Sequence, residues 1–167
     1  MPNKIVVERV DYSATRDREA LVHLLNAYAL DPMGGAEALP ERTRVTLCDK
    51  LAQFPGAASY IAWAEQADGN LLPVGLINLL LGFSTFKAQP LLNVHDVTVL
   101  PEWRGHGISR KLMEAAEAYG REQGCCKMTL EVLEGNTTAW QAYARFGFAP
   151  YELDPAMGHA QFMQKWL

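Results

Sequence analysis

The sequence has little of what a disulfide scaffold, a zinc site or a membrane protein would need. Its three cysteines are an odd number without a CxxC pair, so neither a disulfide framework nor a metal site is indicated. The longest apolar run, "LLPVGLINLLLGF" at 71–83, is too short for a membrane span and predicts a buried strand. Residues 1–13 lack the basic-then-apolar pattern of a signal peptide. We therefore expect a cytoplasmic protein with reduced thiols.

An excess of positive charge is also missing. Fifteen Lys and Arg stand against 19 Asp and Glu, which gives a net charge of −4. Because contacts to nucleic-acid phosphates need clustered cations, we expect no nucleic-acid partner. With 167 residues, of which 49% are apolar, the chain can bury a core, and its length favours one domain over residues 1–167.

Hydrophobic periodicity predicts an α+β fold, with a mixed central sheet of about six or seven strands and about four helices. The expected helices cover residues 13–31, 41–53, 108–123 and 136–146. The expected strands cover residues 4–10, 58–65, 73–83, 91–100, 126–133, 148–153 and 159–167.

The stretch "PEWRGHGISRKL" at 101–112 places two glycines just before one of these helices. The first N–H groups of a helix have no partners and the helix dipole is positive there, so anions can bind. Short glycine motifs are weak signals, and a plain turn with solvated cations fits the same letters. The nucleotide-binding pattern GxxxxGK[ST] is absent.

The wider segment "VTVLPEWRGHGISRKLM" resembles the acyl-CoA-binding signature of the GNAT superfamily of N-acetyltransferases, whose core is [Q/R]-x-x-G-x-[G/A]. Arg104, Gly107 and Ser109 occupy these positions, and Ser109 departs from the family's Gly or Ala while remaining small. A second family pattern, N-x-x-A-x-x-x-Y-x-x-x-G-F, begins at Asn136. The resemblance covers residues 57–153 well and implies the GNAT fold.

The resemblance implies acetyl-CoA (coenzyme A) as the cofactor. The backbone of the preceding strand would pair with the pantetheine arm through Val97, Thr98 and Val99. Backbone amides would hold the pyrophosphate along the loop formed by Arg104, Gly105, His106, Gly107, Ile108, Ser109 and Arg110. Asn136 would also contact the cofactor, near Tyr143.

The resemblance also implies catalytic roles. Tyr143, two helical turns after Asn136, would protonate the departing thiolate, although it could equally be a core aromatic with Trp140 and Phe146. An amine with a pKa of about 10.4 must lose a proton before it attacks. His95 and Asp96 are the candidate bases, and histidine is the better poised near neutral pH.

Strict strand alternation would turn His95 to the same face as Val97 and Val99, whereas a β-bulge would change this parity. On the acceptor side, the loop "ALDPMGGAEAL" at 29–39 would supply pocket residues or serve as a mobile connector. The acceptor-site candidates are Tyr28, Asp31, Met33, His95 and Asp96.

The sequence therefore predicts an acetyl-CoA-dependent N-acetyltransferase that acts on a primary amine by direct attack in a ternary complex. The residues around His95 and Asp96 are similar to those of diamine and polyamine acetyltransferases, which favours a small cationic acceptor or an amino-acid derivative. Acetylation of a protein lysine or N-terminus, or a non-catalytic acyl-CoA sensor, are the alternatives. The apolar segment at 160–167 permits a homodimer.

Overall fold

In a computed structural model, which describes residues 4–158 and 160–167, the chain forms two compact units. The first unit ends at Leu133 and the second runs from Glu134 to Leu167. The expectation of one domain stays a prediction. No helix within the described ranges has the length and apolar character that a membrane crossing would need.

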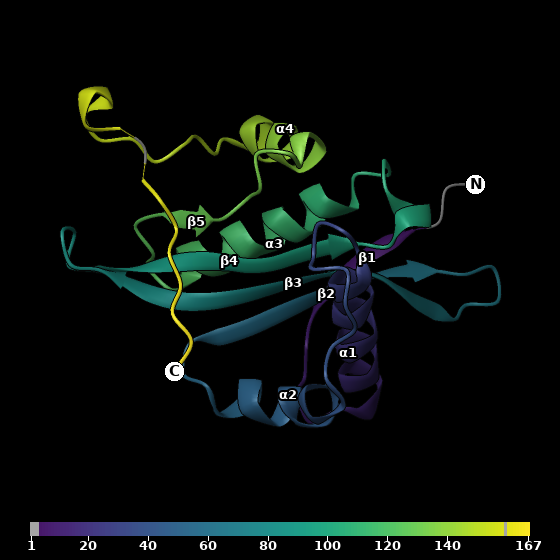
Figure 1. Cartoon of the computed structure of the whole chain (residues 1–167). Coiled ribbons are helices and arrows are strands. Elements are labelled where there is room, and N and C mark those ends of the chain that lie inside the picture. Colours follow the sequence, from purple (N-terminus) through teal and green to yellow (C-terminus); the bar gives the residue numbers. More distant parts are fainter. Residues whose placement is uncertain (1–3, 159) are drawn as a thin grey trace. The chain divides into compact units, whose positions relative to one another are not determined.

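The first unit is built on a five-stranded sheet with the order β1-β2-β3-β4-β5 (Figure 1). The first four strands pair antiparallel, and only β5 runs parallel to its neighbour β4. Their bounds are β1 Ile5–Arg9, β2 Ala57–Glu65, β3 Leu71–Ser84, β4 Gln89–Val99 and β5 Met128–Leu130. Each corresponds to an expected strand, although the sheet is smaller than the six or seven strands predicted.

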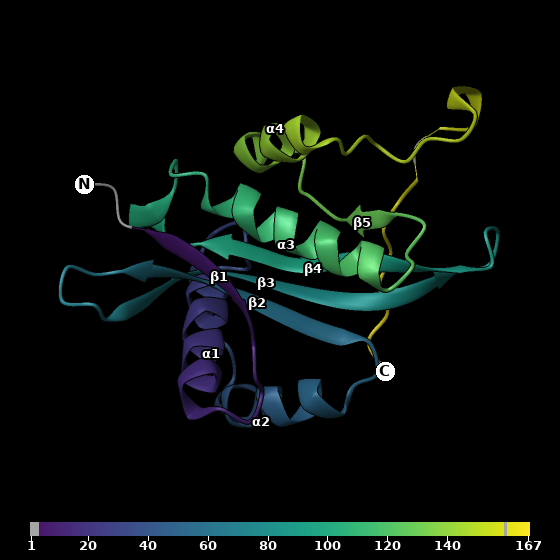
Figure 2. The same ribbon diagram turned by 180° about the vertical axis from the view of Figure 1, so that it is seen from behind.

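Three helices cover the two faces of this sheet. Helices α1 (Thr15–Leu30) and α2 (Glu41–Gln53) lie against one face and α3 (Ile108–Glu122) lies against the other (Figures 1 and 2). The core under α1 and α2 is made of buried apolar side chains, including Leu21, Leu24, Cys48, Ile61, Trp63 and Leu76. On the other face, α3 comes close to β3 because Gly75 has no side chain: a Cβ there would lie 3.1 Å from Ile108 and 3.2 Å from Leu112.

The second unit contains α4 (Thr137–Phe146) and a short 3-10 helix, Pro155–Met157. Helix α4 begins as predicted, because the Asn136 side chain accepts a hydrogen bond from the Ala139 N–H at 3.2 Å. It ends at Gly147, whose φ of +111° suits glycine.

The two strands predicted in the C-terminal tail are a wrong prediction. Residues 148–153 and 160–167 form no strand, and residue 159 of the second one lies outside the described residues. A segment becomes a strand only when a neighbouring strand supplies hydrogen bonds, and Pro150 also removes a donor from the first of these two segments. The homodimer, which was expected from this strand, stays a prediction without that support.

Candidate active site

A β-bulge in β4 is the feature on which the site is built. Asn78 of β3 pairs with Asp96, but the next residue of β3, Leu79, pairs with Val94, so His95 is an extra residue without a partner. This confirms that a bulge changes the parity of the strand at this point. As a result His95 and Asp96 both line the same cavity, and His95 is exposed rather than buried.

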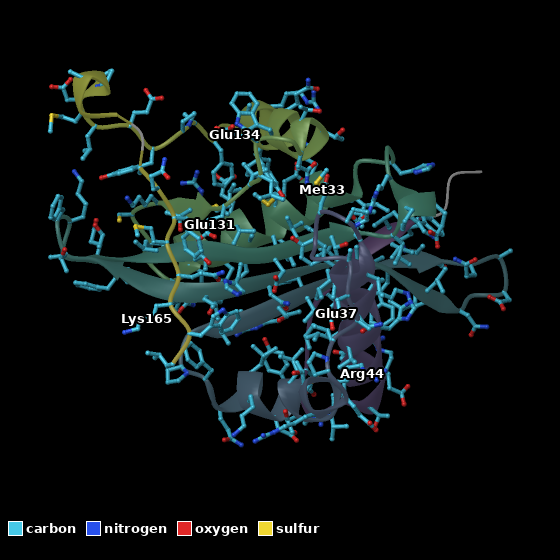
Figure 3. All side chains as sticks on the ribbon, viewed as in Figure 1. Met33, Glu37, Arg44, Glu131, Glu134 and Lys165 are labelled. Carbon is cyan, nitrogen blue, oxygen red and sulfur yellow. The ribbon has the colours of Figure 1, made fainter. Side chains whose placement is uncertain are left out.

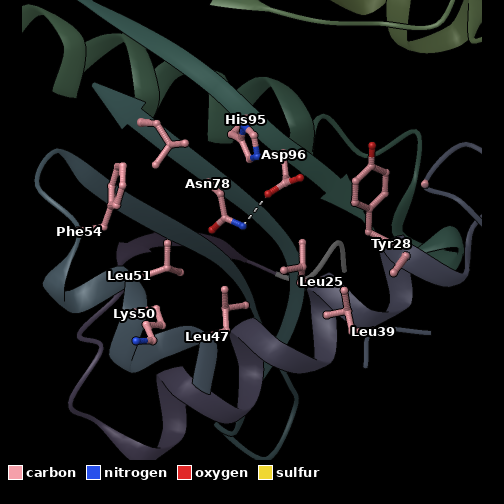
Figure 4. Close-up of a pocket in the computed structure, with 13 residues that line it drawn as sticks. Leu25, Tyr28, Leu39, Leu47, Lys50, Leu51, Phe54, Asn78, His95 and Asp96 are labelled. Carbon is pink, nitrogen blue, oxygen red and sulfur yellow. Dashed lines mark hydrogen bonds between the residues drawn. The ribbon is translucent and has the colours of Figure 1, made fainter. Parts of the chain in front are cut away.

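A row of polar side chains holds Asp96 in place. Ser59, Asn78 and Asp96 lie directly opposite one another on β2, β3 and β4. Asn78 donates to the Asp96 Oδ2 atom at 3.0 Å (Figure 4) and accepts from the Ser59 hydroxyl at 2.6 Å. The Ser59 oxygen lies 2.8 Å from the Tyr12 hydroxyl, and since Ser59 donates to Asn78, Tyr12 must donate to Ser59.

In this series of hydrogen bonds every donor points toward the Asp96 carboxylate, so the series holds the Asp96 side chain in its position. Ser59 and Asn78 are 1% and 5% exposed, so leaving either unpaired would carry a desolvation cost of roughly 1–3 kcal/mol. Burial raises the pKa of Tyr12, with a smaller opposing effect of its bond to Ser59, so the phenol keeps its proton. Among the described residues, Asn78 is the only hydrogen-bond donor to the Asp96 side chain.

The cavity beside His95 and Asp96 has a volume of about 450 Å³ and opens to solvent. Its walls come from α1, α2, the loop between them, β3 and β4 (Figure 4). Most of the lining is apolar: Leu25, Leu39, Leu47, Leu51, Phe54 and Leu80. Cavities of this size are typical of small-molecule sites.

The predicted loop at 29–39 contributes Ala29, Gly34 and Leu39 to the cavity, and Tyr28, which lies just before it in α1, lines the cavity together with His95 and Asp96. The pKa of Tyr28 is raised, first by burial and then by the negative charges of Asp96 and Asp31. Gly34 also lines the cavity, and it must be glycine because a Cβ there would lie 1.9 Å from the Tyr28 carbonyl oxygen.

Asp31 and Met33 lie in the turn that follows α1, and neither is among the cavity-lining residues. Met33 is labelled in Figure 3. Asp31 accepts from the Met33 N–H at 2.9 Å, and its carbonyl accepts from Gly34 at 2.8 Å and Ala36 at 3.1 Å. The Asp31 carboxylate also forms an ion pair with Arg104 at 2.8 Å. Arg104 lowers the pKa of Asp31 through this hydrogen bond. The expected mobile connector is thus a hydrogen-bonded turn.

Beyond the bulge, no strand of residues 4–158 or 160–167 lies beside one edge of β4. Strand β5 pairs with β4 only at Leu92, Asn93 and Val94. The Leu100 N–H bonds to β3, so alternation directs the backbone groups of Thr98 toward β3 and those of Val97 and Val99 toward the other edge. The Val99 carbonyl accepts from Arg104 Nε at 3.1 Å, and the Thr98 side chain is buried.

The loop that follows carries a row of N–H groups. Within the part of the chain that the structure describes, the N–H groups of residues 105–110 have no hydrogen-bond acceptor. Gly105 and Gly107 have φ values of +80° and +73°, and Gly107 is the N-cap of α3. No atom lies within 4 Å of where their Cβ atoms would be, so the space over the loop is open. This is the geometry of an anion site at a helix N-terminus.

The side chains of this loop are partly engaged elsewhere. Arg110 pairs with Glu114 at 2.9 Å, and Arg104 is held by Val99 and Asp31. His106 Nδ1 lies 3.0 Å from the Arg104 carbonyl, so this nitrogen carries the proton. Ile108 is buried against the sheet. The loop therefore offers mainly main-chain donors to an anion.

Asn136 and Tyr143 belong to the second unit and lie on the same helix, α4. None of the residues of α4 is buried, and Tyr143 packs edge-on against Phe148, with ring centroids 6.2 Å apart.

The sequence analysis did not single out the residues that position Asp96 or the apolar wall of the cavity. A signal for Asn78 was present, since it is the only polar residue in the apolar run 71–83. The leucines of the cavity gave no separate signal, because their spacing is that of ordinary core residues.

Comparisons with known proteins place this geometry in a family. The model of the Acetyltransferase (GNAT) family matches residues 19–148. Streptothricin acetyltransferase of Streptomyces lavendulae is 38% identical over 100 residues, which are 58% of this chain and 53% of that protein. Mycothiol acetyltransferase of Tsukamurella paurometabola is 29% identical over 157 residues, 89% of this chain and 50% of that protein. The chain thus spans about half the length of these curated relatives.

Among solved structures, an aminoglycoside N-acetyltransferase in complex with CoA superposes with a TM-score of 0.76. The match covers 99% of this chain and 97% of that chain at 18% sequence identity, which shows a shared fold. The bulged strand, the free strand edge and the glycine loop thus stand in a fold of known type, and the family model spans all three. This chain belongs to the acetyltransferase (GNAT) family.

Proposed function

We propose that the protein is an acetyl-CoA-dependent N-acetyltransferase that acts on the primary amine of a small molecule. The observation that carries this proposal is the layout of β4. Within one strand, the bulge presents His95 and Asp96 to a cavity, and the residues just beyond it present a free edge that leads to the N–H groups of the glycine loop.

The residues of the first unit fit the cofactor. The N–H groups of residues 105–110 match a pyrophosphate, and open space over Gly105 and Gly107 admits it. The free backbone edge at Val97 and Val99 suits the amide groups of a pantetheine arm. When bound, acetyl-CoA supplies the activated acetyl thioester.

The chain's own side chains then handle the amine and its proton. Asp96 holds the ammonium through the carboxylate oxygen that Asn78 leaves free, and His95 takes up the proton so that the neutral amine can attack. Figure 4 shows His95 and Asp96 next to each other at the same end of the cavity. For Asn136 and Tyr143 we propose the family roles of cofactor contact and of proton donor to the departing thiolate.

The acceptor is a small molecule in this proposal because the cavity is a bounded pocket of about 450 Å³. Diamines, polyamines and amino-acid derivatives are the candidate classes that the resemblance suggests. The relatives named for streptothricin, mycothiol and aminoglycosides also have small-molecule acceptors in their names.

The direct test is a thiol-release assay with acetyl-CoA against a panel of primary amines, amino acids and peptides, with mass spectrometry of the products. We expect N-acetylation of at least one small amine. Calorimetry on the same preparation reports acetyl-CoA binding. Binding without turnover of any acceptor would identify a sensor, and preferred turnover of peptides would identify a protein acetyltransferase.

A further inference from the structure

We infer that the acceptor carries a single ammonium group on an apolar body, an inference that rests on the proposed acetyltransferase function. The walls of the cavity are mainly apolar. Seven apolar side chains line it, contributed by α1, the loop after it, α2 with its C-cap, and β3: Leu25, Ala29, Leu39, Leu47, Leu51, Phe54 and Leu80. An acceptor that fills this space removes apolar surface from water, which stabilises the complex by roughly 25 cal/mol per Å².

The number of negative charges in the cavity limits the number of ammonium groups that it matches. Among the cavity-lining residues that the structure describes, Asp96 is the only one with a carboxylate. Asp31 of the adjoining turn is outside the lining and already pairs with Arg104 at 2.8 Å. The cavity therefore offers one fixed anion, held by the Asn78 amide at 3.0 Å, and so matches one ammonium group.

The wall formed by α2 carries a positive charge, that of Lys50. Lys50 lines the cavity with its stem while the residue as a whole is exposed, so its ammonium group reaches solvent. In Figure 4 Lys50 lies on the α2 side, away from His95 and Asp96. A second cation that stays within the cavity would be buried among leucines without a partner or lie near Lys50, and both outcomes are unfavourable.

The single carboxylate and the position of Lys50 favour monoamines among the cationic acceptors that the sequence suggests. Diamines and polyamines place a second ammonium where the cavity has no carboxylate for it. An alkylamine or arylalkylamine places methylene or ring carbons against the leucine walls and its one charge at Asp96. An acceptor whose far end is a carboxylate is intermediate, because Lys50 is exposed and its attraction is screened.

The test uses acceptors that differ only at the far end: hexylamine, 6-aminohexanoate and 1,6-diaminohexane, with eight-carbon and ten-carbon sets to cover length. Each is assayed by thiol release with acetyl-CoA and wild-type protein. We expect kcat/KM to fall from the monoamine through the amino acid to the diamine, by about tenfold or more between the first and last. A diamine that is acetylated as well as or better than the matched monoamine overturns the inference.

A matched pair of variants tests the role of the wall charge. Lys50→Glu is expected to raise kcat/KM for the diamine and lower it for the aminohexanoate, each by about threefold, with hexylamine changed less than about twofold. Lys50→Met removes the charge at similar length and should give intermediate values. No change in the ratio of diamine to aminohexanoate in Lys50→Glu places the far end of the acceptor elsewhere and contradicts the inference.

The two proposals fail in different ways. If no amine of any set is acetylated while acetyl-CoA binds, the proposed enzymatic function is wrong. If amines are acetylated but diamines are preferred, the function stands and only the single-charge inference is wrong.

Discussion

The glycine loop and the acceptor cavity recognise their ligands by different means. The loop offers main-chain N–H groups from residues 105–110, which follow one another in the sequence. The cavity is built from side chains of segments that are far apart in the sequence: α1, α2, β3 and β4. A main-chain site needs only that its backbone be correctly turned, whereas a side-chain site depends on each residue and on strand register. Substitutions should therefore affect the two regions separately.

Asp96→Asn keeps the shape of the side chain and removes its charge. We expect it to give the largest difference between the effect on acceptor turnover and the effect on acetyl-CoA binding. Losing the group that holds the ammonium should lower kcat/KM by about a hundredfold or more. The dissociation constant of acetyl-CoA, measured by calorimetry, should stay within about twofold, because the loop is intact.

His95→Gln is the companion to this variant. If His95 takes the proton, the profile of kcat/KM against pH loses its acidic limb in His95→Gln. A profile of unchanged shape would assign the base to Asp96 or to a water that it holds.

The next largest effect is expected from Tyr143→Phe, which removes one hydroxyl group from α4. If the phenol protonates the departing thiolate, kcat should drop by up to about a hundredfold. The affinity for CoA should barely change. Wild-type turnover in this variant would make Tyr143 a packing residue, in line with its ring contact to Phe148 at 6.2 Å.

Gly107→Ala tests the main-chain region, and Gly124→Ala is its matched control. Both glycines have positive φ, +73° and +69°, and no atom lies within 4 Å of either missing Cβ. Each substitution should therefore cost about 1–2 kcal/mol of backbone strain in the same way. Only Gly107 lies in the loop, so only Gly107→Ala should weaken CoA binding, by about tenfold. Equal CoA affinities in the two variants would remove the loop from the cofactor site.

A smaller effect is expected from Asn78→Ala, because Asn78 positions Asp96 and is not the group that holds the ammonium. We expect kcat/KM to fall by about tenfold, with a loss of stability because the Ser59 hydroxyl loses the amide oxygen to which it donates. The readout that separates positioning from general damage is a double-mutant cycle with Asp96→Asn. The activity cost of Asn78→Ala should vanish in the Asp96→Asn background, and full additivity would show that Asn78 acts independently.

The smallest effect is expected from Asp31→Asn, which weakens the ion pair between the turn beside the cavity and the glycine loop. Because this pair is partly exposed, CoA affinity should change by less than about twofold. Arg104 holds the pKa of Asp31 below its ordinary value of 3.8, so the pair stabilises the fold above that pH and ceases to do so as pH falls through the lowered pKa.

Thermal melting across pH checks this expectation. Any difference in Tm between wild type and Asp31→Asn should be present at neutral pH and shrink as pH falls below 3.8. A large loss of CoA affinity in this variant would show that the cavity and the loop are coupled rather than separate.

The same contrast explains what could be predicted from the sequence. The helix predicted at 41–53 is α2 at those bounds, because its periodicity is local information. The glycine loop was also readable as the turn that precedes α3, since its glycines are close together in the sequence, while its role toward the cofactor stays a prediction. The tail strands were not, because alternation does not tell whether a neighbouring strand exists.

The hydrogen-bonded polar residues of the sheet show most clearly what one sequence does not reveal. Ser59, Asn78 and Asp96 are separated by 19 and 18 residues and meet only through the register of three strands. The bulge that turns His95 into the cavity is likewise a property of pairing, which the residue pattern of one strand does not determine. Asn78 in its apolar run indicated a polar residue within the sheet, but the sequence did not indicate that its partner is Asp96.

The most direct test of this account is a crystal structure of the protein with CoA and hexylamine. We predict that the pyrophosphate accepts hydrogen bonds from the N–H groups of residues 105–110. The amine nitrogen should lie at hydrogen-bond distance, about 3 Å, from the Asp96 carboxylate, with its alkyl chain among the leucines of the cavity. An amine bound outside this cavity, with Asp96 contacting only Asn78, would contradict the account.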